Sequence, residues 1–163
     1  MRIIGIDPGT AITGYSIIET NNGEISLLDY GCIRTPAGLP QSSRLNQIAK
    51  DLSTLIKQYK PQKAAIEKLF FKNNIKTAMQ VSEARGVMLQ KLEEKGIATD
   101  EYTPLEIKTA VCGYGKADKK MVQQMVKLIL NMEEEPQPDD AADAIAIGIC
   151  LANSTALKEK ITS

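Results

Sequence analysis

The chain has 163 residues, enough for one domain with a buried core and too few for two ordinary domains. Its 43% hydrophobic and 25% charged residues are typical of a soluble globular protein and exclude a wholly disordered one, while a net charge of zero does not indicate a nucleic-acid-binding protein. It has no histidine, which excludes histidine-based triads, histidine–zinc sites and the commonest general base, so catalysis would use carboxylates, lysines, hydroxyls or metal-bound water.

The first predicted element is a short apolar strand over residues 2–7, which ends in Asp7 and a Pro-Gly turn. A second strand is predicted over 13–19, and after the hairpin signal Asn21-Asn22-Gly23 a third strand over 25–34. Strands joined by such short turns predict an antiparallel meander. A carboxylate at the tip of a core strand is costly unless it is paired or binds a cation, so Asp7 is a candidate functional residue.

A helix capped by Ser42 or Ser43 is predicted next, followed by a fourth strand over residues 62–67 that ends in a second acid, Glu67. Because this helix connects two buried strands, the fourth strand should run parallel to its neighbour. Ligands bind beyond the carboxyl ends of parallel strands, where both Asp7 and Glu67 fall.

The second half of the chain is predicted to be mostly helical. The elements expected there are a helix over 75–95, a strand over 97–102, a helix to Cys112 capped by Thr103, a helix to Leu130 capped by Asp118, and a last helix from Asp139 or Asp140 to about Asn153. The order predicts an α/β fold with a five-stranded mixed sheet and helices on both faces. We expect one domain over residues 1–155 and a short frayed tail over 156–163.

The last predicted helix begins with a third acidic group. Asp140 and Asp143 are three residues apart and Asp139 and Asp143 are four apart, so either pair nearly shares a helix face. The helix dipole also favours acids at this end, so Asp139 and Asp140 could simply be caps, whereas Asp143 lies deeper in the helix. We predict that this group joins Asp7 and Glu67 in one acidic centre. Oxygen-only ligands favour Mg²⁺ or Mn²⁺, and two such ions are a standard clamp for water attack on a phosphodiester.

Basic segments flank this acidic one. Residues 68–91 carry five lysines or arginines and one acid, residues 106–127 carry five and two, and residues 133–143 carry six acids and no basic residue. The pattern fits a site that holds cations and a polyanion together, and solvated helix faces with chance clustering are the alternative.

Six segments occur in order and at consistent spacing: Gly5-Ile6-Asp7-Pro8-Gly9-Thr10, Thr13-Gly14-Tyr15, Gly31-Cys32-Ile33-Arg34-Thr35, Ala65-Ile66-Glu67 followed by Phe70, Glu83-Ala84-Arg85-Gly86-Val87, and Asp140-Ala141-Ala142-Asp143-Ala144. Together they resemble the RuvC-type Holliday junction resolvases over nearly the whole chain. The resemblance implies a ribonuclease H-like fold and a homodimer. It also implies Mg²⁺-dependent, paired, symmetric nicking of four-way DNA junctions, with 5′-phosphates left at the nicks.

The resemblance also implies roles for individual residues. Its four metal-binding catalytic carboxylates, which would hold two Mg²⁺ ions or Mn²⁺ in their place, correspond to Asp7, Glu67, Asp140 and Asp143. Asp139 is an extra acid, and which of Asp139 and Asp140 is the ligand stays open, although spacing favours Asp140.

Lysines that the family uses near the phosphate match Lys108 and Lys119, of which Lys119 would stabilise charge in the transition state. Lys116 and Lys120 are weaker candidates for contacts with the DNA backbone. For Lys108 and Lys119, an ordinary exposed lysine is the alternative.

Phe70 matches an aromatic residue of the family that would stack on an unpaired base, and a core position is the alternative, favoured for Phe71. Loop residues Lys72, Asn73 and Asn74 would then contact DNA. The helix over 75–95 has small or apolar residues on more than one face, so one side could cover the sheet and the other a partner subunit. The resemblance alone implies a further partner, a branch-migration motor complex of the RuvA–RuvB type.

Three other classes of protein are the alternatives. Actin-like and sugar-kinase-like ATPases open with a similar Gly-Ile-Asp-x-Gly-Thr loop but need a second lobe. An RNA-cleaving relative would share the fold, and a non-catalytic DNA binder would gain nothing from carboxylates that repel phosphate.

The expected location is the cytoplasm. Cys32, Cys112 and Cys150 form no CxxC pair and are expected to be reduced, mostly buried thiols. No apolar run approaches the ~18 residues of a membrane helix, and Asp7 interrupts the only early apolar stretch, so we expect neither membrane association nor a signal peptide.

Overall fold

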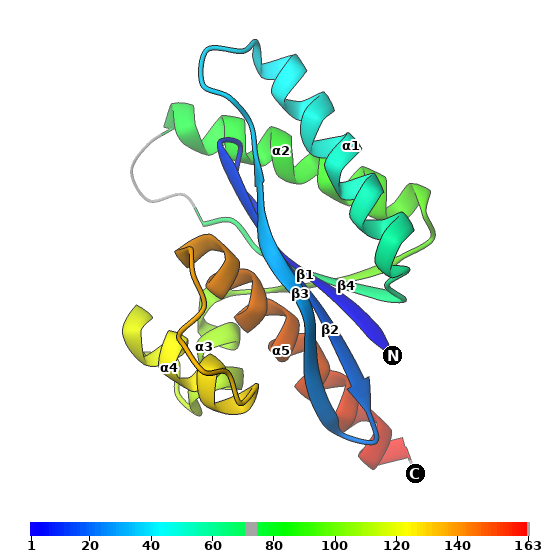
Figure 1. Cartoon of the computed structure of the whole chain (residues 1–163), viewed down its shortest axis with the longest axis vertical. Helices are drawn as coiled ribbons and strands as arrows, with labels where there is room; N and C mark the ends of the chain where they lie inside the picture. The colour runs from blue at the N-terminus through cyan, green and yellow to red at the C-terminus, as the bar shows by residue number, and fades with distance from the viewer. Residues whose placement is uncertain (71–74, 163) are drawn as a thin grey trace.

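The computed structural model describes residues 1–70 and 75–162 and has one mixed sheet of five strands in the order β3-β2-β1-β4-β5 (Figure 1). The strands are β1 (Arg2–Asp7), β2 (Ile12–Asn21), β3 (Glu24–Arg34), β4 (Lys63–Glu67) and β5 (Ala98–Tyr102). The first three form the predicted antiparallel meander, and β4 and β5 continue the sheet parallel to β1. The helices are α1 (Gln41–Tyr59), α2 (Ile75–Glu94), α3 (Pro104–Cys112), α4 (Lys119–Ile129) and α5 (Asp139–Thr162).

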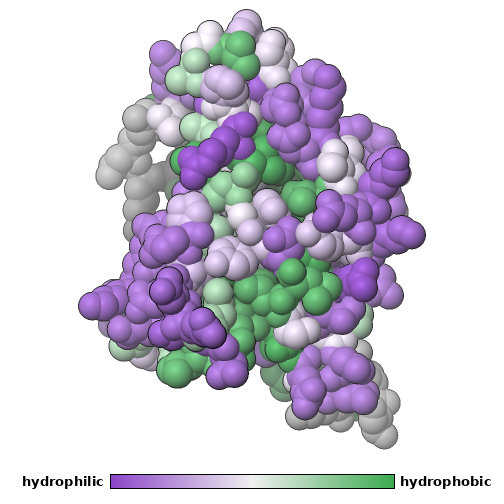
Figure 2. Space-filling model, viewed as in Figure 1, coloured by the Kyte–Doolittle hydropathy of each residue, from purple (hydrophilic) through white to green (hydrophobic). Residues whose placement is uncertain are grey.

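Helices cover both faces of the sheet, as predicted. Helices α1 and α2 lie on one face, and α5 crosses the other with α3 and α4 packed beside it (Figure 1). Because side chains alternate along a strand, β1 sends Ile4 and Ile6 toward α1 and α2 and Ile3 toward α5. Asp7 has the parity of Ile3 and therefore belongs to the face that α5 covers. Hydrophilic side chains cover the outer surfaces of α1 and α4 (Figure 2).

Helix α5 crosses the sheet at very short range. A Cβ atom on Gly5 would lie 2.3 Å from the carbonyl oxygen of Ala144, and one on Gly14 would lie 1.9 Å from the carbonyl oxygen of Asp140. Ser16 donates a hydrogen bond of 2.8 Å to the Ala144 carbonyl. Only glycine at these strand positions lets the helix backbone come so near the sheet. The beginning of α5 is thereby held against β1 and β2.

Two predicted helix caps are present and one is wrong. Thr103 caps α3 in a capping box with Glu106, and Asp118 caps α4 by accepting from the backbone of Met121 at 2.8 Å. Helix α1 begins at Gln41 after Pro40 without a side-chain cap, so neither Ser42 nor Ser43 has the predicted role.

The predicted frayed tail is also wrong, because α5 continues to Thr162 instead of ending near Asn153. The polar Asn-Ser pair suggested a helix end. In the structure, Asn153 donates to the carbonyl oxygen of Ala110 and Ser154 donates back to the carbonyl oxygen of Cys150. No glycine or proline follows to stop the helix.

The stretch Asp139–Lys158 of α5 is long and apolar enough to span a membrane by length and composition, contrary to the expectation from sequence. Of that window, 67% is buried inside the molecule. Its apolar side chains are part of the core against the sheet, so its hydropathy reflects a core helix.

Candidate active site

Two acidic residues end two neighbouring parallel strands. Asp7 is the last residue of β1 and Glu67 the last residue of β4, and the register pairs Ile6 with Ile66 directly before them. Asp7 and Glu67 therefore stand side by side at one edge of the sheet. Because both have the parity of residues facing α5, they also share a face.

The first turns of α5 bring two further acids to the same edge. The contact of Gly14 with the Asp140 carbonyl holds the helix start against β2, and β2 pairs Gly14 with Asp7. Asp143 lies one turn deeper and borders a pocket together with Glu67. The four carboxylates predicted from sequence thus come from β1, β4 and α5 to one region of the molecule.

Burial, together with the charges of neighbouring acids, raises the pKa of three of these carboxyl groups. Burial, followed by the charges of Asp143, Glu67 and Asp140, raises the pKa of Asp7 from 3.8 to about 8. Burial and then the charge of Asp143 raise the pKa of Glu67. Burial also raises the pKa of Asp143, although Lys119 opposes the effect. Ionising all of these carboxylates together therefore needs more positive charge than Lys119 and Lys108 supply.

This donor set fits a hard divalent cation, because carboxylate oxygens are the ligands that Mg²⁺ prefers in proteins. The raised pKa of Asp7 is the structural observation in favour of such an ion, because a bound cation would stabilise the ionised form that burial and the other acids disfavour. Within residues 1–70 and 75–162, no three acidic or cysteine side chains lie close enough to form a closed metal-binding group. The metal and the number of ions accordingly stay predictions.

Asp139 and Asp140 have different surroundings. Asp139 is exposed and turns toward α4, where Lys119 lies 3.1 Å from its Oδ2 and Gln123 donates to its Oδ1 at 2.9 Å. Asp140 is half-buried, and its charge is one of those that raise the pKa of Asp7, whereas Asp139 is not among them. The geometry favours Asp140 as the member of the acidic centre.

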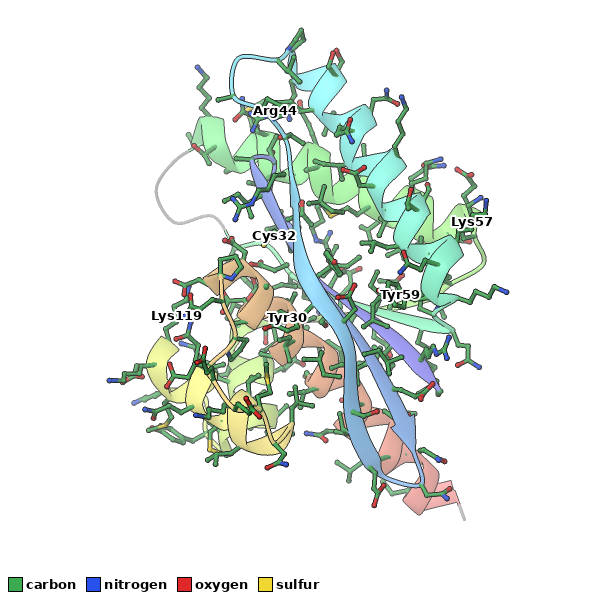
Figure 3. The ribbon with its side chains drawn as sticks, viewed as in Figure 1. Tyr30, Cys32, Arg44, Lys57, Tyr59 and Lys119 are labelled. Atoms are coloured by element: carbon green, nitrogen blue, oxygen red, sulfur yellow. The ribbon has the colours of Figure 1, made fainter. Side chains whose placement is uncertain are left out.

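Two of the four predicted lysines reach the acids. Lys119 extends from the first turn of α4 toward α5, with its Nζ 3.4 Å from Oδ2 of Asp143 (Figure 3). The charge of Lys108 partly offsets the rise in the pKa of Glu67. Lys108 also lines a pocket of about 240 Å³ together with Glu67, Asp143 and Lys119. Lys116 and Lys120 are exposed near the start of α4, as DNA-contacting residues would need to be.

Phe70 is 62% exposed, so the alternative that it belongs to the core is wrong. It borders a hollow of about 490 Å³ together with Lys68, Arg85 and Glu101. Lys72 and Asn73, which were predicted to contact DNA, lie outside the described residues, as do Phe71 and Asn74.

Sequence reasoning missed two neighbours of the centre. Arg85 of α2 donates to the backbone carbonyl of Glu67 at 3.1 Å and forms an ion pair with Glu101 on β5, so it braces the end of β4. Cys32 lies close enough for burial and the charge of Asp140 to raise its pKa. Arg85 lies within one of the six segments that carry the resemblance, which was the available signal. Cys32 also lies within one of these segments, and the pairing of β2 with β3 places it opposite Gly14.

A five-stranded mixed sheet with helices on both faces and carboxylates at the ends of β1 and β4 defines a ribonuclease H-like α/β protein with a nuclease-type acidic centre. The sequence profile described as "Crossover junction endodeoxyribonuclease RuvC" matches residues 3–151. The chain belongs to this family of nucleases.

Individual relatives cover nearly the whole chain. The crossover junction endodeoxyribonuclease RuvC of Heliobacterium modesticaldum is 51% identical over 154 residues, which are 94% of this chain and 95% of that protein. The one from Halothermothrix orenii is 49% identical over 160 residues, with 98% and 97% covered. The solved structure of Thermus thermophilus RuvC in complex with a Holliday junction substrate has 30% sequence identity and a TM-score of 0.91, covering 97% of this chain and 96% of that one.

Proposed function

We propose that the chain resolves four-way DNA junctions by paired symmetric nicks that leave 5′-phosphates, in a reaction that depends on Mg²⁺. Family membership supports the nuclease activity and the junction substrate. The observation that carries the metal dependence is the group of four carboxylates at one edge of the sheet, where the pKa of Asp7 is raised to about 8.

In this proposal Asp7, Glu67, Asp140 and Asp143 hold two Mg²⁺ ions, for which Mn²⁺ can substitute. Bound Mg²⁺ supplies positive charge that favours deprotonation of the attacking water and stabilises the leaving oxygen. The carboxylates hold this charge at the ends of β1 and β4 and at the start of α5, and the rigid sheet fixes their spacing.

The lysines act on the phosphate. Lys119 carries an ammonium at the edge of the acidic centre, where it can stabilise the negative charge that develops on the phosphate. Lys108 of α3 lines the same pocket and offers a second positive charge. Phosphate oxygens entering this pocket would meet cations from both α3 and α4.

Contacts to the rest of the junction are proposed for the surface around this pocket. Exposed Phe70 can stack on an unpaired base next to the centre, which is worth roughly 1–3 kcal/mol. Lys116 and Lys120, with Lys72 and Asn73 outside the described residues, would contact the backbone and fix the position of the strands.

A homodimer formed through the beginning of α2 would supply two such centres for the two strands to be cut. Ile75 and Met79 are 80% and 61% exposed and line, with Ala78, a largely apolar hollow of about 360 Å³. A second copy of this helix is the occupant that we propose, because a two-fold pair matches the symmetry of the junction. The branch-migration motor of the RuvA–RuvB type and a cytoplasmic location remain proposals based on the family resemblance.

The proposal is tested by nicking of an end-labelled synthetic four-way junction, beside linear duplex of the same sequence and a structured RNA. We expect symmetric nicks in the junction with Mg²⁺ and none with EDTA. Asp7→Asn should abolish nicking and keep junction binding, whereas Glu134→Gln, an exposed acid in the loop before α5, should change neither. Cleavage of the RNA in preference to the junction, or nicking that persists in EDTA, would refute it.

A further inference from the structure

Lys119 makes two ion pairs, one with an aspartate that borders the catalytic pocket and one with an aspartate that does not. Its Nζ lies 3.1 Å from Oδ2 of Asp139 and 3.4 Å from Oδ2 of Asp143. The two aspartates are four residues apart on α5, so both contact the ammonium from the same helix. Asp143 borders the catalytic pocket, whereas Asp139 does not.

Asp139 is itself held in place by α4. Its Oδ1 accepts a hydrogen bond of 2.9 Å from Nε2 of Gln123, whose side chain is almost fully buried, so both carboxylate oxygens of Asp139 have partners on α4. The start of α4 is fixed in turn by the Asp118 cap. The orientation of Asp139 is therefore set by a buried amide and does not depend on Lys119 alone.

The charge of Asp139 acts on Asp143 but is not among those that act on Asp7. Asp143, Glu67 and Asp140 are the acids whose charges raise the pKa of Asp7, and Asp139 is not one of them. Asp139 has a single cationic partner within the described residues, and that partner is Lys119.

We propose that Asp139 is a positioning residue that holds the Lys119 ammonium at the edge of the acidic centre when cations occupy the centre. The inference rests on the proposed function. When Asp143 binds a divalent ion, its carboxylate is no longer free for Lys119, and the ion repels the ammonium. Asp139 then provides the remaining attraction, which keeps Lys119 beside the phosphate.

A double-mutant cycle on the nicking rate tests this at saturating junction and Mg²⁺. Asp139→Asn keeps the acceptor for Gln123 and removes the charge, and we expect it to lower kcat by about 3- to 30-fold with little change in KM. Lys119→Met should cost about 100-fold. In the Lys119→Met background, Asp139→Asn should have no further effect, because Asp139 acts through Lys119. Glu134→Gln removes an equal charge in the loop before α5 and should leave kcat unchanged.

The Mg²⁺ dependence separates positioning from metal ligation. Half-saturating Mg²⁺ should stay within about twofold of wild type in Asp139→Asn, whereas Asp140→Asn should shift it at least tenfold. Calorimetric titration of the DNA-free protein with Mg²⁺ should give the same contrast without relying on activity.

A second measurement follows Lys119 directly. Acetylation of the DNA-free protein by limiting acetic anhydride, read by mass spectrometry, should modify Lys119 about two- to fivefold faster in Asp139→Asn than in wild type, relative to exposed Lys120. We expect the difference to persist with saturating Mg²⁺. This measurement needs no cleavage, so an inactive wild-type protein would refute the proposed function and leave the contact testable.

Three results would overturn the inference. One is an additive loss of rate when Asp139→Asn is combined with Lys119→Met. Another is recovery of Asp139→Asn at high Mg²⁺, which would make Asp139 a ligand. The third is equal acetylation of Lys119 in the variant and in the wild type with Mg²⁺ present.

Discussion

At the scale of single residues, Asp7 is a carboxyl group whose ionised form is strongly disfavoured in the folded protein. A carboxyl whose pKa is about 8 in the folded protein and 3.8 in the unfolded chain binds its proton more tightly when folded. Unfolding between about pH 4 and pH 8 therefore releases a proton, and stability falls as pH rises through this range. Asp7 therefore lowers the folding stability of the metal-free protein near neutral pH, as expected of a residue whose role is chemical and not structural.

We therefore expect Asp7→Asn to raise the Tm of the metal-free protein by at least about 3 °C at pH 7.5, since 1 kcal/mol corresponds to roughly 2–4 °C in a chain of this size. Toward pH 4 the gain should disappear, because Asp7 then becomes protonated in the unfolded chain as well as in the folded protein. Thermal unfolding in EDTA across this pH range measures both. A variant less stable than wild type at pH 7.5 would contradict the expectation.

Mg²⁺ should have the opposite pH dependence. Binding requires the ionised carboxylates, so it releases protons and becomes stronger as pH rises toward the pKa of Asp7. The increase in Tm on adding Mg²⁺ should be larger at pH 8 than at pH 6, and small in Asp7→Asn at both. Equal increases at the two pH values would show that Mg²⁺ binds elsewhere.

At the scale of elements, the acidic centre depends on how closely α5 approaches β1 and β2. The carbonyl of Asp140 lies where a side chain on Gly14 would begin, and that of Ala144 lies where one on Gly5 would begin. Since the first turns of α5 carry Asp140 and Asp143, any displacement of the helix start moves two of the four carboxylates.

Gly14→Ala should accordingly lower the Tm by about 4–8 °C, which corresponds to an overpacking cost of roughly 2 kcal/mol, and should abolish nicking. Gly86→Ala is the matched control, because a Cβ there meets nothing within 4 Å and alanine is favoured in a helix. The control should be as stable as wild type or slightly more so. A stable and active Gly14→Ala variant would mean that the helix start is not critical for the site.

The helices and strands differ in how well the sequence predicts them. The alternation and turn signals predicted all five strands, and the acids at the ends of 2–7 and 62–67 followed from that alone. The helix caps at Thr103 and Asp118 were predictable because capping is local. The extent of α5 was not, because Asn153 and Ser154 are satisfied by contacts that are visible only in three dimensions. The brace from Arg85 to Glu67 likewise joins residues of different elements, and no local pattern encodes it.

At the scale of the whole molecule, the proposed homodimer would bring two acidic centres to one junction. The apolar surface at the beginning of α2 is the proposed contact between copies, and exposed apolar side chains of this size are costly in water. The proposal makes the dimer a requirement for paired nicks, since each copy supplies one acidic centre.

Met79→Lys should therefore shift the protein from dimer to monomer in size-exclusion chromatography with light scattering. We expect the unfolding temperature to change little, because Met79 is exposed in the single chain. Junction cleavage should become single, unpaired nicks. A Met79→Lys variant that stays dimeric would show that this face of α2 is not the dimer contact.

Helix α5 is at once the largest covering of one sheet face and the carrier of two carboxylates at its first turns. Residues Ile145, Ile147 and Ile149, directly after the acids, have no measurable or almost no exposure. The amide hydrogens of this segment should then exchange with solvent only through global unfolding, with the slowest rates in the chain. The centre has no separate melting step. When the core unfolds, the acidic centre is lost with it. Heat should therefore abolish catalysis and the fold at one temperature.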